Sequence, residues 1–257
     1  MSRKRSKRKR PSREDFMLSE QVKIEEGVFE KRTMLKLAAL FTHGIISKLN
    51  FIIARGKEAD VYLADAGEKV GGGTVIVKIF RIETSSFDRR IDYITGDPRF
   101  GKIKHSMHAI VEEWCKKEYI NLKMAEEAGV HAPKPYMFSG NVLAMEFIGN
   151  GNVPAPMLKD AQISNPKEIL DEIIGDIKKL YRIGIVHADM SEYNILVSEG
   201  VPYMIDFGQA VSVKHPKAED FLKRDVFNIV SYFNKVYGLN VDPNNALDSV
   251  VKNDSKA

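Results

Sequence analysis

The sequence predicts a mixed α and β fold that forms either one bilobal domain or two small ones. Short apolar, β-branched runs at residues 49–53, 61–64 and 74–80 are typical of strands. Apolar residues recur at helical spacing over residues 110–128 and 166–183. The chain has 257 residues, 44% of them hydrophobic, which is enough to bury a substantial core.

Basic residues are concentrated at the N-terminus. Residues 1–10 contain seven Lys or Arg and no acid, so the rest of the chain carries 32 basic and 35 acidic residues. We expect residues 1–15 to form a basic tail that is disordered when free. Such a tail favours contact with RNA phosphates, although a solubility tail or a nuclear address would have the same composition.

The composition excludes several protein classes. The single cysteine, Cys115, leaves no partner for a disulfide framework, which favours a reducing cytosol. No apolar run approaches about 18 residues and the N-terminus is charged, so neither a membrane span nor a signal peptide is expected. The six histidines lack the spacing of metal ligands. We therefore expect a cytoplasmic protein.

Residues 16–48 are expected to form an N-terminal helical extension, because apolar residues at 29–41 have helical spacing. The loop at 55–60, between the first two strands, contains one glycine, Gly56. It therefore matches neither G-x-x-x-x-G-K-[ST] nor G-x-G-x-x-G, and by itself is typical of a charged hairpin loop. Three glycines at 71–73 predict the turn between the second and third strands.

Lys78 interrupts the third strand, which is otherwise apolar. It is either an edge lysine whose amine reaches water or a buried ammonium that needs a partner. In the helix at 110–128, Trp114 and Leu122 share an apolar stripe, and Glu118 lies in its middle. A Lys78–Glu118 pair explains both charged groups better than a local pair of Glu118 with Lys116 or Lys117.

The most informative pattern is the spacing of His187, Asp189, Asn194 and Asp206. Asp189 precedes Asn194 on a loop, where it can accept a proton from an incoming hydroxyl group or orient that group. His187 is expected to support this loop rather than to act as an acid or base. Together these residues predict a phosphoryl-transfer centre.

The two metal-ligating candidates are predicted to meet at the open end of a hairpin. Apolar runs at 195–197 and 202–205 flank a turn at 198–200, which is a strand–turn–strand pattern. Folding this hairpin brings Asn194 and Asp206 together. An amide oxygen and a carboxylate side by side are suitable ligands for Mg²⁺.

Three helices are expected in the C-terminal half. Isoleucines of the helix at 166–183 face the core, an amphipathic helix covers 221–233, and a short helix covers 246–251. Asp225, on the second of these, either anchors the loop around Asp189 or is only a charge near a helix N-terminus.

Five segments together resemble the RIO family of atypical serine/threonine protein kinases, closest to its first subfamily as found in archaea. The resemblance covers roughly residues 45–237. The segments are GKEADVY at 56–62, KIFRIET at 78–84, MEFIG at 145–149, HADMSEYN at 187–194 and IDFGQA at 205–210.

The resemblance implies a bilobal kinase-like fold, with a small β-rich N-lobe at 49–145, a hinge at 146–149 and a reduced, mainly helical C-lobe over 146–257. It also implies the use of ATP and Mg²⁺, with Mn²⁺ as an alternative. The implied roles are phosphate contact for Gly56, Lys57 and Lys78, pairing with Lys78 for Glu118, backbone contact with adenine for Glu146 and Ile148, catalysis for Asp189, and metal binding for Asn194 and Asp206.

The long polar stretch at 81–109 corresponds in the family to a flexible loop that carries autophosphorylation, and such loops are usually functional or mobile. The candidate acceptors are Thr84, Ser85, Ser86 and Ser106.

The sequence departs from related kinases at three places. Ala54 and Arg55 stand where this subfamily has Ser-Thr, so a hydroxyl contact from that loop to phosphate is not expected. Ser191 stands where ordinary protein kinases have lysine, which predicts slow turnover. Residues 209–223 form a short segment without Ala-Pro-Glu, so the usual platform for a peptide substrate is absent.

Three functions are compatible with these residues. The leading one is a serine/threonine kinase that phosphorylates itself and acts on small ribosomal subunit precursors or their assembly factors, with ribosomal RNA contact by the basic tail. The second is an ATPase-driven assembly switch with an aspartyl-phosphate at Asp206. The third, a small-molecule phosphotransferase, is disfavoured because the chain has no obvious acidic substrate-binding insertion.

Overall fold

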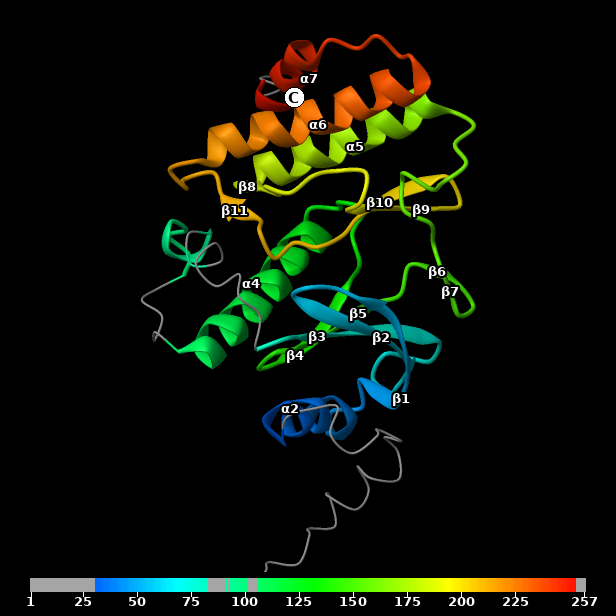
Figure 1. Cartoon of the computed structure of the whole chain (residues 1–257), viewed down its shortest axis with the longest axis vertical. Helices are drawn as coiled ribbons and strands as arrows, with labels where there is room; N and C mark the ends of the chain where they lie inside the picture. The colour runs from blue at the N-terminus through cyan, green and yellow to red at the C-terminus, as the bar shows by residue number, and fades with distance from the viewer. Residues whose placement is uncertain (1–30, 83–90, 92, 101–105, 253–257) are drawn as a thin grey trace, which may run out of the picture.

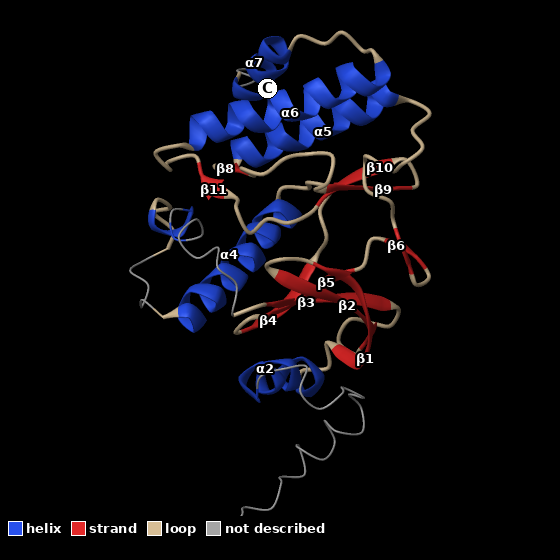
Figure 2. Ribbon diagram, in the orientation of Figure 1, coloured by secondary structure: helices blue, strands red, loops and turns tan. Residues whose placement is uncertain are grey.

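The computed structural model describes residues 31–82, 91, 93–100 and 106–252. The basic tail and three of the acceptor candidates, Thr84, Ser85 and Ser86, lie outside these residues. The described residues form a strand-rich N-terminal lobe and a mainly helical C-terminal lobe (Figures 1 and 2). No helix in this part of the chain is long and apolar enough to cross a membrane. The predicted bilobal α+β fold is confirmed.

The N-lobe is built on one five-stranded antiparallel sheet in the order β1-β2-β3-β5-β4. Its strands are β1 (Ile46–Arg55), β2 (Ala59–Ala66), β3 (Thr74–Phe80), β4 (Pro135–Ser139) and β5 (Val142–Glu146). Gly71, Gly72 and Gly73 all have positive φ, as the turn between β2 and β3 requires. The central strand β3 pairs with β2 on one side and with β5 on the other. This pairing fixes the position of Lys78 within the sheet.

Helix α2 (Lys31–Thr42) covers one side of this sheet. Leu37 and Leu40 are fully buried in a core with the sheet residues. Asn141, which is buried at the turn between β4 and β5, donates to Thr33 Oγ1 at 3.1 Å and to Phe80 O at 2.9 Å. The predicted N-terminal helix thus packs on the small lobe through apolar and polar contacts.

Helix α4 (Met107–Glu127) connects the two lobes. Its side chains Trp114, Cys115 and Leu122 belong to the larger core, which continues into the C-lobe. In Figure 1 the helix runs from beside the sheet towards the C-lobe helices. One helix therefore contacts both halves of the site described below.

The C-lobe is formed by helices and short strand pairs. The helices are α5 (Pro166–Arg182), α6 (Ala218–Tyr237) and α7 (Pro243–Val251). The strand pairs are β8 (Ile185–Val186) with β11 (Val211–Ser212), and β9 (Ile195–Ser198) with β10 (Val201–Met204). Between the lobes, β6 (Gly149–Asn150) and β7 (Val153–Pro154) form a small hairpin that the sequence did not predict.

The expectation of one structureless loop over residues 81–109 is partly wrong. Residues 93–95 are helical, and Ile94 and Asp97 are almost completely buried against the C-lobe. Ser106, one of the acceptor candidates, is the N-cap of α4, and its hydroxyl accepts from Ala109 N at 3.3 Å. Local polarity misled the prediction, because these residues are ordered by distant contacts.

Candidate active site

The predicted hairpin forms and brings its two polar ends together. β9 and β10 pair over all four residues of each strand. Glu199 and Gly200 make the turn with φ values of 51° and 80°. Beyond the ladder, Ile205 N donates to Asn194 O at 2.9 Å. Asn194 and Asp206 therefore flank the open end of the hairpin, as the sequence predicted.

Asn194 also holds Asp189. Its Nδ2 donates to Asp189 O at 2.7 Å and to Asp189 Oδ2 at 3.0 Å. Burial, and then the charge of Asp206, raises the pKa of Asp189 to about 6, although the bond from Asn194 opposes this shift. A carboxylate with a pKa near neutrality is suited to accept a proton, and Oδ1 of Asn194 is the oxygen that can bind a hard cation.

Asp206 lies between these groups and the N-lobe. Its φ is 65°, a left-handed conformation that is uncommon outside glycine. Lys78 Nζ lies 3.2 Å from Asp206 Oδ1, and this ammonium group holds the pKa of Asp206 below its ordinary value. The carboxylate is therefore ionised at neutral pH, and 48% of the side chain remains exposed to a ligand.

The predicted Lys78–Glu118 pair is confirmed. Nζ of Lys78 donates to the two carboxylate oxygens of Glu118 at 2.8 and 2.9 Å. Burial lowers the pKa of Lys78, but Asp206 and Glu118 outweigh this effect and raise it. Burial raises the pKa of Glu118 to about 7, and contact with the ammonium opposes that rise. The pair joins α4 to β3 and directs Lys78 towards Asp206.

Helix α6 anchors the loop that carries Asp189. Asp225 is buried, and its carboxylate accepts from Ala188 N at 2.7 Å and from Met190 N at 3.0 Å. Arg224 donates to Ala188 O. Ala188 has a φ of 65°, so these contacts hold a conformation that alanine rarely adopts. Of the two interpretations of Asp225, the anchor is confirmed.

His187 also supports the loop that carries Asp189. Its Nε2 lies 3.2 Å from Ile205 O, and its ring packs edge-on against Phe207 with 4.7 Å between centroids. Burial lowers the pKa of His187 to about 4. The ring is therefore neutral at physiological pH, in agreement with a supporting role.

The single-glycine loop lies between β1 and β2. Gly56 N donates to Ala59 O at 2.8 Å, and a Cβ at this position would lie 3.0 Å from that oxygen. The charge of Glu58, at the far side of this loop, is the smallest of the effects that raise the pKa of Asp189. Lys57 is exposed, and among the described residues no hydrogen bond or ion pair joins it to Asp189 or the metal-site candidates.

The hinge residues lie at the end of β5, an interior strand of the sheet. Glu146 N donates to Lys134 O at 2.8 Å, and the side chain of Glu146 accepts from Lys134 N at 3.1 Å. Ile148 is buried, and its carbonyl accepts from Ala155 N at 3.0 Å. These contacts hold the backbone between β5 and β6 in one conformation, but they do not test its predicted contact with adenine.

The sequence did not single out two polar side chains of α4, Lys117 and Asn121. Both are fully buried, and both bind backbone carbonyls in the segment that follows Asp206. Their spacing of four residues was the only available signal, and it is shared by many exposed helix positions. Only the docking of α4 distinguishes them.

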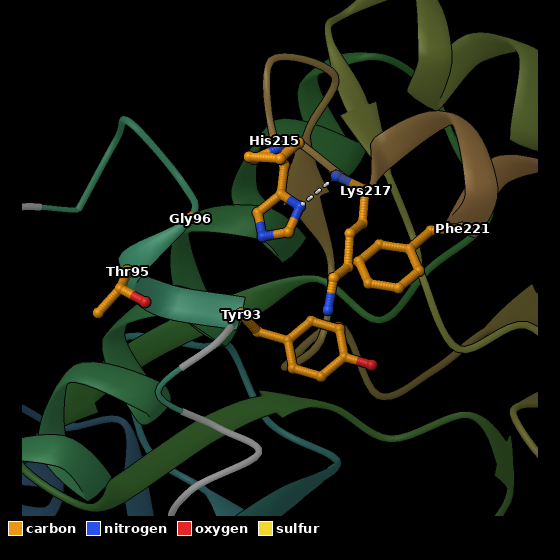
Figure 3. A pocket seen from close by; sticks show the side chains of 7 residues that line it. Tyr93, Thr95, Gly96, His215, Lys217 and Phe221 are labelled. Carbon is orange, nitrogen blue, oxygen red and sulfur yellow. Dashed lines mark hydrogen bonds between the residues drawn. The ribbon is translucent and has the colours of Figure 1, made fainter.

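A separate cavity of about 450 Å³ lies outside this centre (Figure 3). It is bordered by aromatic and polar residues of two segments. These residues are Tyr93, Thr95, Gly96, His215, Pro216, Lys217 and Phe221. Phe221 stacks on Tyr93 and on His215, with ring centroids 5.4 and 5.6 Å apart. None of the predicted nucleotide or metal residues lines the cavity.

Comparison with known sequences finds relatives over most of the chain. A family model described as the RIO domain matches residues 60–246. The RIO-type serine/threonine-protein kinase Rio1 of Thermoplasma acidophilum is 43% identical over 192 residues, which cover 75% of this chain and 99% of that protein. The Rio1 of Methanocaldococcus jannaschii is 40% identical over 217 residues, covering 84% of this chain and 73% of that protein.

A more distant relative and a solved structure extend the comparison. Human serine/threonine-protein kinase RIO1 is 37% identical over 213 residues, covering 81% of this chain and 37% of the human protein. The Rio2 kinase of Chaetomium thermophilum, solved as an ADP/Mg²⁺-phosphoaspartate complex, has a TM-score of 0.68 at 23% identity, covering 91% of this chain and 72% of that one. This structural likeness concerns the fold. The sequence matches and the placement of the motif residues establish that this chain belongs to the RIO family of serine/threonine-protein kinases.

Proposed function

We propose that this kinase transfers the γ-phosphoryl group of ATP to serine or threonine hydroxyl groups, its own included, in a Mg²⁺-dependent reaction. The observation that carries the proposal is the position of Lys78, which contacts Glu118 and Asp206 at once. An ammonium group held in this way is suited to bind the α- and β-phosphates. Asp189 and Asn194 lie beside Asp206, so the groups needed for transfer converge on one place.

Each residue then has a defined task. Asp189 accepts or orients the proton of the incoming hydroxyl group. Asn194 and Asp206 offer an amide oxygen and an ionised carboxylate, a donor set that fits Mg²⁺ because this ion also takes water and phosphate ligands. Bound Mg²⁺ would neutralise the charge that develops on the phosphates.

The nucleotide would lie between the lobes. The backbone of Glu146 and Ile148 would hold the adenine, and Gly56 and Lys57 would approach the phosphates from the loop. Support for these assignments comes from their matching positions in the family motifs and from the ordered backbone of both segments.

A second candidate is an ATPase cycle in which the Asp206 carboxylate attacks the γ-phosphorus, ADP leaves, and water then hydrolyses the acyl phosphate. Two observations favour it. Residues 209–217 leave only a short segment between Gly208 and α6, and the Rio2 structure of similar fold is titled a phosphoaspartate complex.

We further infer a role in maturation of the small ribosomal subunit, with the precursor particle or its assembly factors as partners and the cytoplasm as location. The support is the family resemblance together with the seven basic residues at positions 1–10, which suit contact with ribosomal RNA. Deletion of residues 1–10 should weaken binding to precursor RNA and reduce its salt dependence. Binding that stays unchanged would exclude the RNA role of the tail.

The chemical test uses γ-labelled ATP and the stability of the labelled bond. A label that resists acid and hydroxylamine identifies phosphoserine or phosphothreonine, whereas a hydroxylamine-labile label identifies an acyl phosphate. Asp189→Asn separates the candidates further, because a carboxylate attack needs no proton acceptor. The variant should lose the stable label under the first candidate and keep a labile one under the second. If it retains full stable labelling, the role of Asp189 is wrong.

A further inference from the structure

The backbone that follows Asp206 is held by side chains from outside its own segment. Asn121 Nδ2 donates to Phe207 O at 2.9 Å, and Lys117 Nζ donates to Gly208 O at 2.9 Å. Both side chains also donate to Ala210 O, and the distance from Asn121 Nδ2 to this oxygen is 3.0 Å. Three carbonyls within four residues of Asp206 therefore bind donors on α4.

The burial of Lys117 is unusual for a structural lysine. The residue is fully buried, and the two carbonyl oxygens are its hydrogen-bond acceptors. Its ammonium group also lies 5.4 Å from the ring centroid of Trp114 and 5.9 Å from that of Phe100. Burial lowers the pKa of Lys117 to about 7, and the charges of Asp97 and Glu118 oppose this shift. An apolar residue would fill this space at lower cost, so what the lysine adds here is its hydrogen-bond donors.

The same helix controls the side chain of Asp206. Glu118, next to Lys117, holds Lys78 against the Asp206 carboxylate. Trp114, one turn earlier, lies so close to Gly208 that a Cβ there would be 2.7 Å from Nε1. Helix α4 thus acts on Asp206 at two points. Glu118 acts on its carboxylate through Lys78, and Lys117 acts on the backbone that follows it.

A second segment holds the far end of the same backbone. Asp97 accepts from Ser212 N at 3.1 Å, and Arg99 donates to Asn121 Oδ1 at 2.9 Å. Figure 3 shows Gly96 facing His215, and a Cβ at Gly96 would lie 2.2 Å from the His215 ring. The segment from 207 to 215 is therefore fixed between α4 and residues 96–99.

We propose that Lys117 and Asn121 are positioning residues, which set the place of Asp206 by holding the carbonyls of Phe207, Gly208 and Ala210. They take the place of a long activation segment, because contacts with α4 and Asp97 hold the segment after Gly208. The proposal rests on the proposed role of Asp206 as a metal ligand. It predicts that loss of either donor weakens metal-dependent nucleotide binding without unfolding the protein.

The test compares Lys117→Met with Lys116→Met. Methionine keeps the length of the side chain and removes the donors. Lys116 is the matched control, since 43% of its side chain is exposed. Within the described residues its one ion pair is with the nearby Glu113, at 2.9 Å. Asn121→Ala is the second variant, because it leaves the buried ammonium in place and provides an answer if Lys117→Met does not fold.

The first readout is amide hydrogen exchange, which needs no nucleotide or metal. Exchange at residues 207–213 should rise about tenfold to a hundredfold in Lys117→Met or Asn121→Ala, with β9 and α5 unchanged. The second is the Mg²⁺ concentration that half-saturates ADP binding, which should rise about tenfold or more. Lys116→Met should change neither quantity.

The outcomes are distinct. Exchange at 207–213 that stays as in the wild type, or that rises equally throughout the protein, would overturn the positioning role. Increased local exchange with an unchanged Mg²⁺ requirement would also overturn it. Asp206→Asn in the otherwise unchanged protein tests the metal role separately: if Mg²⁺-dependent ADP binding survives in that variant, the proposed function of Asp206 fails, whereas the exchange result on Lys117 still stands.

Discussion

Replacing Gly208 with alanine should destabilise the protein through a single steric contact. A Cβ at this position would lie 2.7 Å from Trp114 Nε1, 3.0 Å from Cε2 and 3.2 Å from Cζ2. The indole ring is rigid and Trp114 is buried, so relief requires a shift of α4 or of the segment after Asp206. Overpacking of this kind costs about 1–3 kcal/mol of unfolding free energy.

A double-mutant cycle isolates that contact. Trp114→Leu has no atoms at the three clashing positions and should itself cost about 2–4 kcal/mol, because it leaves a cavity. Combined with Gly208→Ala, the total loss should fall short of the sum by most of the alanine cost, about 1–3 kcal/mol. Urea denaturation of the four proteins gives each value. Strict additivity, or a Gly208→Ala variant as stable as the wild type, would refute the steric argument.

Other predictions concern charge. Because burial raises the pKa of Asp189 to about 6 and catalysis needs its ionised form, kcat/KM should fall as the pH drops below about 6, and a flat profile from pH 5 to 8 would contradict this role. Burial lowers the pKa of the neutral His187 to about 4, so its contribution to stability is present above about pH 6.5 and is lost as the pH falls. The unfolding free energy should drop by about 2 kcal/mol between pH 7 and 5 for this reason. In urea denaturation at a series of pH values, His187→Phe should remove that part of the pH dependence. Lys78→Met should weaken ATP binding about tenfold to a hundredfold in calorimetry, whereas Glu118→Gln should have a smaller effect because Lys78 keeps its contact with Asp206; equal losses would show that Glu118 is needed to place the amine.

Structural features that depend on the local hydrophobic period and on residue spacing were predicted correctly. The hairpin that joins Asn194 to Asp206 follows from two short apolar runs around a Gly200 turn. Glu118 was recognised as buried because it interrupts an apolar helical stripe, and its partner because it interrupts an apolar strand. Each of these features is visible within a few neighbouring residues.

Polar residues outside an apolar stripe were not predicted. Asp97 and Arg99 lie in a stretch that resembles a solvated loop, yet Asp97 is buried against Ser212. The role of Asp225 stayed open for a different reason, since a carboxylate on the first turns of a helix has two ordinary explanations. The choice required the distances to Ala188 and Met190.

The sequence by itself determined the mixed α and β elements, the hairpin between Asn194 and Asp206 and the two members of the Lys78–Glu118 pair, because hydrophobic periodicity and turn chemistry act over short distances along the chain. Only the tertiary structure decided what holds the backbone after Asp206. The partners of Lys117 lie more than about 90 residues away, and whether a lysine faces solvent or a row of carbonyls depends on how α4 docks between the lobes. Burial of that one helix face turns an ordinary polar side chain into a donor for the backbone that follows Asp206.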